Sequence, residues 1–228
     1  MGGPIIRLID AISISDWYEA ITWAAVIILV LLIAFPLHEL FHALAADRLG
    51  DSTPRDHGRI TLNPFKQLSL LGSVLFLVVG FGWASVPINN ANFGREWRQK
   101  AALVALAGPT ANLLLAVLFA IIYRGLDSIS LSEASLTTFR IVTVSQSVMA
   151  IGVSLNTFLC IFNLLPVPPL DGARAFVTLL PETVEPYFAQ FQRFGILILL
   201  AISQTGLLNI LVNQPATNLA RFLLGTAA

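Results

Sequence analysis

The stretch "HELFH" at residues 38–42 places two histidines and a glutamate within five positions. On a helix, residues i and i+4 lie on one face a turn apart, so His38 and His42 can offer imidazole nitrogens to one metal ion. This spacing matches the HExxH pattern, in which two zinc ligands accompany a general base, here Glu39. Zinc lowers the pKa of a bound water to about 7, and the carboxylate takes the proton as that water attacks a carbonyl.

A catalytic zinc site needs a third protein ligand, which the motif does not contain. A third histidine ten residues after the first is excluded, because Arg48 stands at that position. His57 lies in a charged loop and is interpreted as a solvated histidine. Asp171 follows the proline-rich end of an apolar run, "NLLPVPPLDG", which is expected to hold its carboxylate at membrane depth. Asp171 is therefore a candidate ligand, with an ordinary turn aspartate as the alternative.

The composition is that of an integral membrane protein. Of 228 residues, 56% are hydrophobic and 11% charged, whereas soluble domains carry about 25% charged residues. A charge at the centre of a membrane helix costs about 2.5–3.5 kcal/mol, so an ionisable cluster in such a helix indicates function. The formal net charge is zero, and nothing in the sequence indicates a nucleic-acid partner. The only cysteine, Cys160, lies in an apolar run and is predicted to be buried.

Five apolar stretches predict an all-α polytopic membrane protein with a bundle of about four to five transmembrane helices: residues 17–49, 68–87, 99–123, 139–165 and 188–212. Basic residues flank the second stretch on both sides and predict that both flanking loops face the cytoplasm. Glycines and a proline interrupt this stretch, which is therefore predicted to be a re-entrant or β element between the first helix and the central core helix. We expect one domain over residues 1–228, with core motifs in 35–176 and C-terminal helices in 187–227.

Several motifs together resemble the site-2 protease family of intramembrane zinc metalloproteases, in its compact form without a PDZ domain. They are "HELFH", "GRITLNP" (58–64), "FGWASVPIN" (81–89), "ALAGPTANLLLA" (105–116) and "FNLLPVPPLDGARAF" (162–176). The combination of HExxH with a downstream N-x-x-P-x-P-x-L-D-G in apolar segments is specific to this family, whereas either half alone is not.

The resemblance implies a role for each matching residue. It implies that His38, His42 and Asp171 bind zinc and that Glu39 is the catalytic glutamate. Asn163 matches an asparagine that stabilises the developing oxyanion or binds the substrate backbone.

Asn112 matches the end of a G-x-x-x-N element and is a candidate for substrate binding. The alternative is an interhelical amide hydrogen bond beside close helix packing at Gly108. The chain departs from the family pattern at Gln67 and Ser69, where compact members often have His and Asp, and at Ser85, where a lysine is common.

The expected function is that of an intramembrane metalloendopeptidase with one zinc ion per chain, acting on transmembrane protein substrates within the lipid bilayer. "HELFH" and "PPLDG" are expected to approach the cytoplasmic side of the cell membrane together. The alternatives are a membrane metal-binding or transport protein and an inactive scaffold homologue. Both fit less well, because the polar residues concentrate near one face and all four candidate ligand and base positions are filled.

Overall fold

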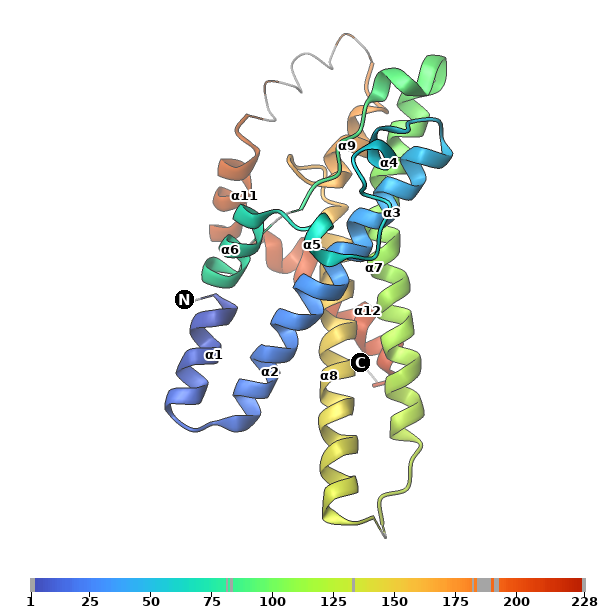
Figure 1. The fold of residues 1–228 in the computed structure, drawn as a ribbon. Helices are drawn as coiled ribbons and strands as arrows, with labels where there is room; N and C mark the ends of the chain where they lie inside the picture. The colour runs from blue at the N-terminus through green and yellow to red at the C-terminus, as the bar shows by residue number, and fades with distance from the viewer. Residues whose placement is uncertain are drawn as a thin grey trace.

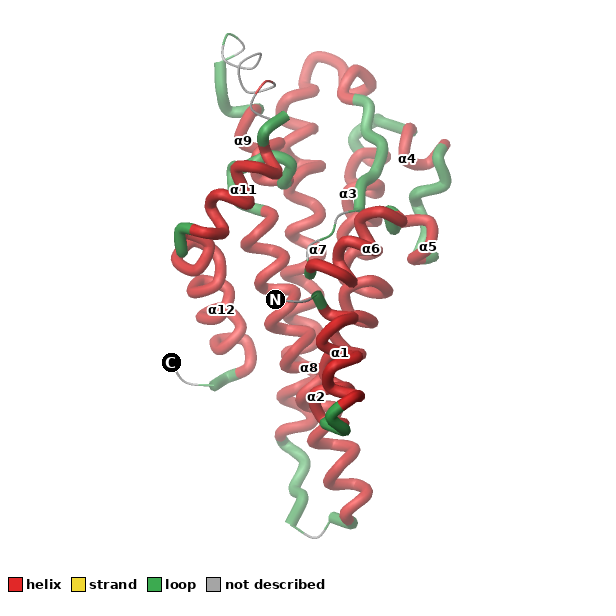
Figure 2. The backbone as a smooth tube through the Cα atoms, turned by 90° about the vertical axis from the view of Figure 1, so that its left-hand side faces the viewer, coloured by secondary structure: helices red, strands yellow, loops and turns green. Residues whose placement is uncertain are grey.

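The computed structural model describes residues 3–226 except 81, 83, 133, 182, 184–189, 191 and 192, and the described residues are mainly helical (Figure 1). Figure 2 shows helices joined by loops, with no strand among the described residues. Within the described part of the chain, three helices are long and apolar enough to cross a membrane: residues 17–48, 90–127 and 136–163. A fourth candidate is a pair of helices, 197–204 and 209–224, bent by 88°. The predicted all-α class is confirmed, and the candidate spans number three or four.

The first long helix consists of α2 (Trp17–Ile28), a π-helical segment η1 (Leu29–Ala34) and α3 (Phe35–Arg48). The side chain of Asp16 caps its start by accepting a hydrogen bond from the backbone N–H of Glu19 at 3.0 Å. Pro36 has no N–H to donate to the preceding turn, and the wider π-helical turns end directly before it. This irregular segment directly precedes the helix that carries the "HELFH" motif.

The centre of the molecule is a hairpin of α7 (Trp97–Asp127) and α8 (Leu136–Asn163), against which α3 packs along α7 (Figure 1). Gly152 of α8 allows close contact, because a Cβ there would lie 2.8 Å from the ring of Phe119. The two helices share a buried apolar cluster with η1 and the C-terminal helix: Leu29, Leu115, Phe119, Ala120, Val153 and Ala220. These contacts hold α3, α7 and α8 side by side.

Within its described residues, the second apolar stretch forms one short helix, α6 (Leu70–Val79), and the short helix α5 (Pro64–Gln67) directly precedes the stretch. Ten residues are too few to cross a bilayer, which needs about 20. Ser69 caps the start of α6, and Gly80 ends it with a φ of 85°. The β element predicted here does not form among the described residues, because residues 84–89 belong to no strand. Residues 81 and 83 of this stretch lie outside the described residues, and a re-entrant path for 68–87 stays a prediction.

The N-terminal helix α1 (Pro4–Ser13) begins where α6 ends (Figure 1). The backbone N–H of Gly3 donates to the carbonyl of Val78 at 2.8 Å, so the two short helices meet end to end. A Cβ at Gly3 would lie 2.4 Å from the backbone of Val78, so this contact requires glycine. Of these two short helices, α1 packs alongside α2 of the first long helix.

The two basic loops meet at one end of the molecule. Asp51, after α3, is fully buried. It accepts hydrogen bonds from both the N–H and the hydroxyl of Thr53, the first residue of the short helix α4 (Thr53–Asp56). Across the loops it also accepts from the N–H of Asn89 at 2.8 Å and the amide of Asn92 at 2.6 Å. The second of these groups belongs to η2 (Asn90–Glu96), which leads into α7. If the stretch 68–87 enters and leaves the membrane at the same face, its two flanking loops are expected to meet in this way.

Asp51→Asn is expected to lower the free energy of unfolding by about 1–3 kcal/mol, because it turns an amide N–H₂ toward groups that are themselves donors. Burial raises the pKa of Asp51, but the hydrogen bonds from Thr53, Asn89 and Asn92 outweigh it and leave the pKa below its usual value. The carboxylate therefore stabilises the fold above about pH 4, the unfolded pKa, and this contribution is lost as the pH falls through the lower folded value.

Unfolding of the detergent-solubilised protein at pH 7 and at successively lower pH measures this effect. The difference between wild type and Asp51→Asn is expected to shrink on acidification. Asp56→Asn is the matched control, because this exposed carboxylate in the same loop contacts only Ser52. An equal loss in both variants contradicts the special role of Asp51.

The C-terminal part contains α11 (Gly195–Gln204), a π-helical segment η3 (Asn209–Asn213) and α12 (Gln214–Leu224). The guanidinium of Arg124 donates to the carbonyls of Phe222 and Leu223 at 3.0 and 2.8 Å and ties the end of α12 to α7. The predicted C-terminal helices begin at 187, and residues 187–189 lie outside the described residues. The described helices begin later and bend sharply between α11 and α12.

Candidate metal centre

The two histidines of "HELFH" are buried on one face of α3, toward α7. His42 Nδ1 lies 2.7 Å from the backbone carbonyl of Val104 on α7. A carbonyl oxygen can only accept, so Nδ1 carries the proton and Nε2 presents a lone pair. The backbone of α7 thus fixes both the direction of this ring and its tautomer.

Asp171 is the first residue of the short helix α9 (Asp171–Val177), after the turn that follows α8. Leu170 is extended and ends this turn. A Cβ at Gly172 would lie 2.2 Å from the carbonyl oxygen of Leu164, so glycine is required for the turn to close against the end of α8. The proline-rich stretch therefore returns the chain to α3, and the Asp171 carboxylate is buried there.

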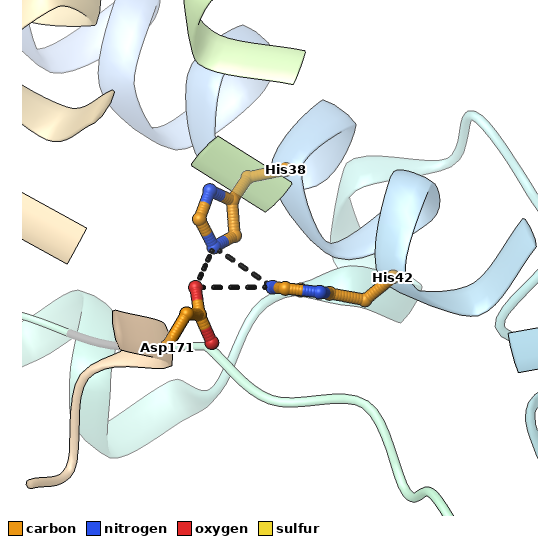
Figure 3. A group of neighbouring side chains, drawn as sticks. All are labelled: His38, His42 and Asp171. Atoms are coloured by element: carbon orange, nitrogen blue, oxygen red, sulfur yellow. Dashed lines mark hydrogen bonds and ion pairs between the residues drawn. The ribbon is translucent and has the colours of Figure 1, made fainter. Parts of the chain in front are cut away.

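The three side chains converge on one point (Figure 3). Asp171 Oδ2 lies 3.0 Å from His38 Nε2 and 3.2 Å from His42 Nε2, and the two Nε2 atoms are 3.1 Å apart. Ligands at 2.0–2.1 Å from a tetrahedral zinc ion lie about 3.3 Å from one another, so this triangle matches one face of such a site. Two imidazole nitrogens and a carboxylate are also a donor set that zinc prefers.

Gly108 of α7 leaves the room that an ion needs. A Cβ on this residue would lie 2.3 Å from His42 Nε2 and 2.5 Å from His38 Nε2. These distances are close to a zinc–nitrogen bond length, so a side chain here would occupy the place of an ion. The donor set and this space both fit a zinc site.

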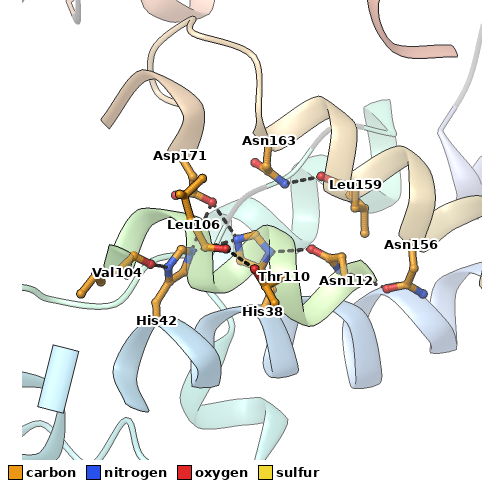
Figure 4. Close-up of polar contacts among 10 residues, drawn as sticks. All are labelled: His38, His42, Val104, Leu106, Thr110, Asn112, Asn156, Leu159, Asn163 and Asp171. Carbon is orange, nitrogen blue, oxygen red and sulfur yellow. Dashed lines mark hydrogen bonds and ion pairs between the residues drawn. The ribbon is translucent and has the colours of Figure 1, made fainter. Parts of the chain in front are cut away.

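The predicted base lies on α3, which carries two of the ligands, and the predicted amide lies at the end of α8, before the turn that leads to Asp171. Glu39 is buried on α3 next to His38. Asn163 is the last residue of α8, and its Nδ2 donates to the carbonyl of Leu159 at 2.9 Å (Figure 4). Since an amide nitrogen carries two protons, one remains for another acceptor. The catalytic roles of these two residues stay predictions.

Asn112 is completely buried on α7 and faces His38. Its Oδ1 lies 2.6 Å from His38 Nδ1, and its Nδ2 donates to Asn156 Oδ1 on α8 at 3.1 Å (Figure 4). The interhelical amide hydrogen bond considered as an alternative is therefore present, and a substrate contact of Asn112 stays a prediction. The sequence interpretation missed Asn156, for which the only signal was an amide in an apolar run.

Arg98, near the start of α7, holds the other end of α9. Its guanidinium donates to the carbonyls of Val177 and Thr178 at 3.2 and 3.3 Å, and to that of Leu180. A cation at the C-terminus of a helix satisfies carbonyls that lack partners and complements the helix dipole. The contact connects α9, and with it Asp171, to the helix that carries Gly108.

Arg98→Met is expected to lower zinc affinity several-fold and to reduce thermal stability, because it keeps the aliphatic stem but removes every donor to α9. Competition with a chromophoric chelator measures the affinity of the purified protein. Arg95→Met is the control, because Arg95 is exposed in η2, three positions away. Unchanged zinc affinity in Arg98→Met rules out a role of this arginine in placing Asp171.

Comparison with known proteins agrees with this geometry. A model of peptidase family M50 matches residues 25–204, most of the chain and all three converging side chains. The chain belongs to peptidase family M50. This is the site-2 protease family, whose predicted resemblance is thereby confirmed.

Curated relatives of this M50 member cover nearly the whole chain. The "Putative zinc metalloprotease YwhC" of Bacillus subtilis is 35% identical over 83% of this chain and 85% of its own length. The "Putative zinc metalloprotease Rip2" of Mycolicibacterium smegmatis is 32% identical over 90% of this chain and 82% of its own length. No solved structure gives a significant match.

As an M50 member, the chain is a metallopeptidase of a membrane-embedded family. The helices long enough to cross a bilayer agree with an integral membrane protein. The predicted cofactor, zinc, is supported by the family and by the group of His38, His42 and Asp171.

Proposed function

We propose that this protein is an intramembrane zinc metalloendopeptidase that hydrolyses peptide bonds in or next to transmembrane segments of other membrane proteins. The convergence of His38, His42 and Asp171 carries the proposal, since it assembles a buried metal-binding group between helices long enough to cross a membrane. We propose these three residues as the ligands of one zinc ion. The whole chain acts as one membrane domain.

Zinc bound by these residues supplies Lewis-acid chemistry, which activates water and polarises a carbonyl group. Glu39 adjoins the ligands on α3 and acts as general base: its carboxylate takes a proton from the attacking water. The same proton then passes to the leaving amine. A buried carboxylate on the helix that holds two ligands is well placed for both transfers.

Asn163 stabilises the negative charge that develops on the carbonyl oxygen of the substrate. One proton of its amide is held by the carbonyl of Leu159, which fixes the side chain, and the second is available to the oxyanion. A donor that is fixed before the reaction stabilises the transition state more than a donor that must first reorient. In this proposal the base comes from α3 and the oxyanion donor from the end of α8.

A transmembrane substrate must lose helical structure before cleavage, because its peptide bonds are shielded by their own backbone hydrogen bonds. We propose that residues 68–87 form a re-entrant element that receives the unwound segment. The short α6 and the meeting of the flanking loops at Asp51 support this. The basic loops at this end support a cytoplasmic orientation of the site in the cell membrane.

A metal transporter is a less suitable interpretation, because it needs polar ligands along a path through the bilayer. Within the described part of the chain, the only group that could hold a metal ion is formed by His38, His42 and Asp171. An inactive scaffold is also disfavoured, since Glu39 is in place beside the ligands.

The test is cleavage of a transmembrane substrate by the purified protein in proteoliposomes, with products identified by mass spectrometry. We expect cleavage inside or at the edge of the substrate helix, loss of cleavage with a zinc chelator and recovery when zinc is restored. Zinc binding without cleavage of any member of a library of single-span substrates contradicts the proposal.

A further inference from the structure

A buried chain of hydrogen bonds leads from the backbone of α8 to the ring of His38. Figure 4 shows its part from Asn156 through Asn112 to His38. Asn156 Nδ2 donates to the carbonyl of Gly152 at 2.9 Å, and its Oδ1 accepts from Asn112 Nδ2 at 3.1 Å. Asn112 Oδ1 then lies 2.6 Å from His38 Nδ1. Both asparagines are at most 1% exposed, so water does not compete for these groups.

The direction of every bond in this chain follows from its first member. The carbonyl of Gly152 can only accept, so Asn156 must turn its N–H₂ group toward it and its oxygen toward Asn112. Asn112 must then present its N–H₂ group to Asn156 and its oxygen to His38. His38 Nδ1 must therefore be the donor, which leaves the lone pair of Nε2 facing Asp171.

We propose that Asn156 is a positioning residue of the metal centre, which holds the Asn112 amide in the orientation that keeps His38 in its metal-binding tautomer. The inference rests on the proposed zinc site but not on proteolysis. Outer-shell partners of metal-binding histidines act in this way in general, by fixing the ring and its protonated nitrogen.

The two histidines differ in what fixes them. Val104 accepts directly from His42 through a backbone carbonyl, which cannot turn around. His38 instead depends on an amide, whose oxygen and nitrogen ends have nearly the same shape. Reversed, the Asn112 amide would offer a donor to Nδ1 and favour the proton on Nε2, which then cannot bind a metal ion. Asn156 is the group that discriminates between these two orientations.

The competing explanation is that Asn156 merely joins α7 to α8 by a polar contact. A double-mutant cycle separates the two, with zinc affinity measured by chelator competition on the purified full chain. The variants are Asn156→Leu, Asn112→Asp and the two combined. A carboxylate has no donor to present to His38, so in the Asn112→Asp background no second residue is needed to orient this group.

Loss of the direct partner of a metal-binding histidine, here Asn112, usually weakens metal binding about 10- to 100-fold. Asn156 acts through Asn112, so we expect Asn156→Leu to weaken zinc binding by about 10-fold, the lower end of that range. In the Asn112→Asp background the same change is expected to weaken binding by less than about threefold. The isosteric Asn156→Asp keeps the acceptor for Asn112 but loses the donor to the carbonyl of Gly152, so it is expected to restore part of the affinity. If the leucine variant does not fold, Asn156→Val, which is smaller and equally lacks an acceptor, takes its place.

Thr157→Val is the control, because Thr157 is equally buried one position along α8 and its hydroxyl contacts only the carbonyls of Val153 and Ser154. It is expected to keep wild-type zinc affinity. Wild-type affinity in Asn156→Leu, or the same loss in both backgrounds, overturns the proposal and leaves Asn156 a helix-packing residue. Failure to cleave a substrate leaves these affinities unaffected, so the two proposals are tested separately.

Discussion

Glu39→Gln is expected to bind zinc as wild type does and to lose hydrolysis by about 10²–10⁴-fold, the usual contribution of a general base. Glutamine has nearly the same size and can occupy the same buried place on α3. Its amide cannot take a proton from water, and it cannot return one to the leaving amine. The ligands are unchanged, so zinc content should remain one ion per chain.

The measurement is the initial rate of substrate cleavage in proteoliposomes beside zinc content determined by mass spectrometry on the same preparation. Glu96→Gln is the matched control, because this glutamate is exposed at the end of η2 and far from the ligands in sequence. It should cleave at the wild-type rate. Wild-type turnover by Glu39→Gln would refute the assignment of the base, whereas loss of zinc would show that Glu39 acts through the metal site.

The sequence predicted best those features that depend on neighbouring residues. The i, i+4 spacing in "HELFH" is sufficient to place His38 and His42 on one face of a helix, whatever the rest of the chain does. The long apolar runs likewise predicted α7 and α8 to within a few residues. Asp171 was different. Spacing alone made it one of several acidic residues that could be the third zinc ligand, and only the family motif singled it out.

Features that depend on contacts between helices could not be predicted in this way. Nothing near Gly108 in the sequence shows that two imidazoles point at its missing Cβ. Asn156 and Arg98 act on groups 44 and about 80 positions away, and such pairs are visible only once the helices are placed. The apolar stretch 68–87 was predicted to be a re-entrant or β element; no strand forms among its described residues, and the capping by Ser69 and Gly80 favours a short helix.

Gly108→Ala is expected to weaken zinc binding by at least about 100-fold and to abolish hydrolysis with it. The new methyl group would lie 2.3–2.5 Å from both Nε2 atoms, where the ion is expected. The helix cannot easily move away, because Val104 and Asn112, on either side of Gly108, are both hydrogen-bonded to the histidines of α3. The substitution by itself should stabilise the helix, since alanine is favoured over glycine inside a helix by about 1 kcal/mol.

Gly125→Ala in the same helix is the matched control for Gly108→Ala. A Cβ there meets no atom within 4 Å, so this variant shares the gain in helix propensity without any contact. It should bind zinc as wild type does and unfold at the same or a slightly higher temperature. If Gly108→Ala folds and still binds zinc tightly, the ion does not lie between the two histidines, because a methyl group and a metal ion cannot share that space.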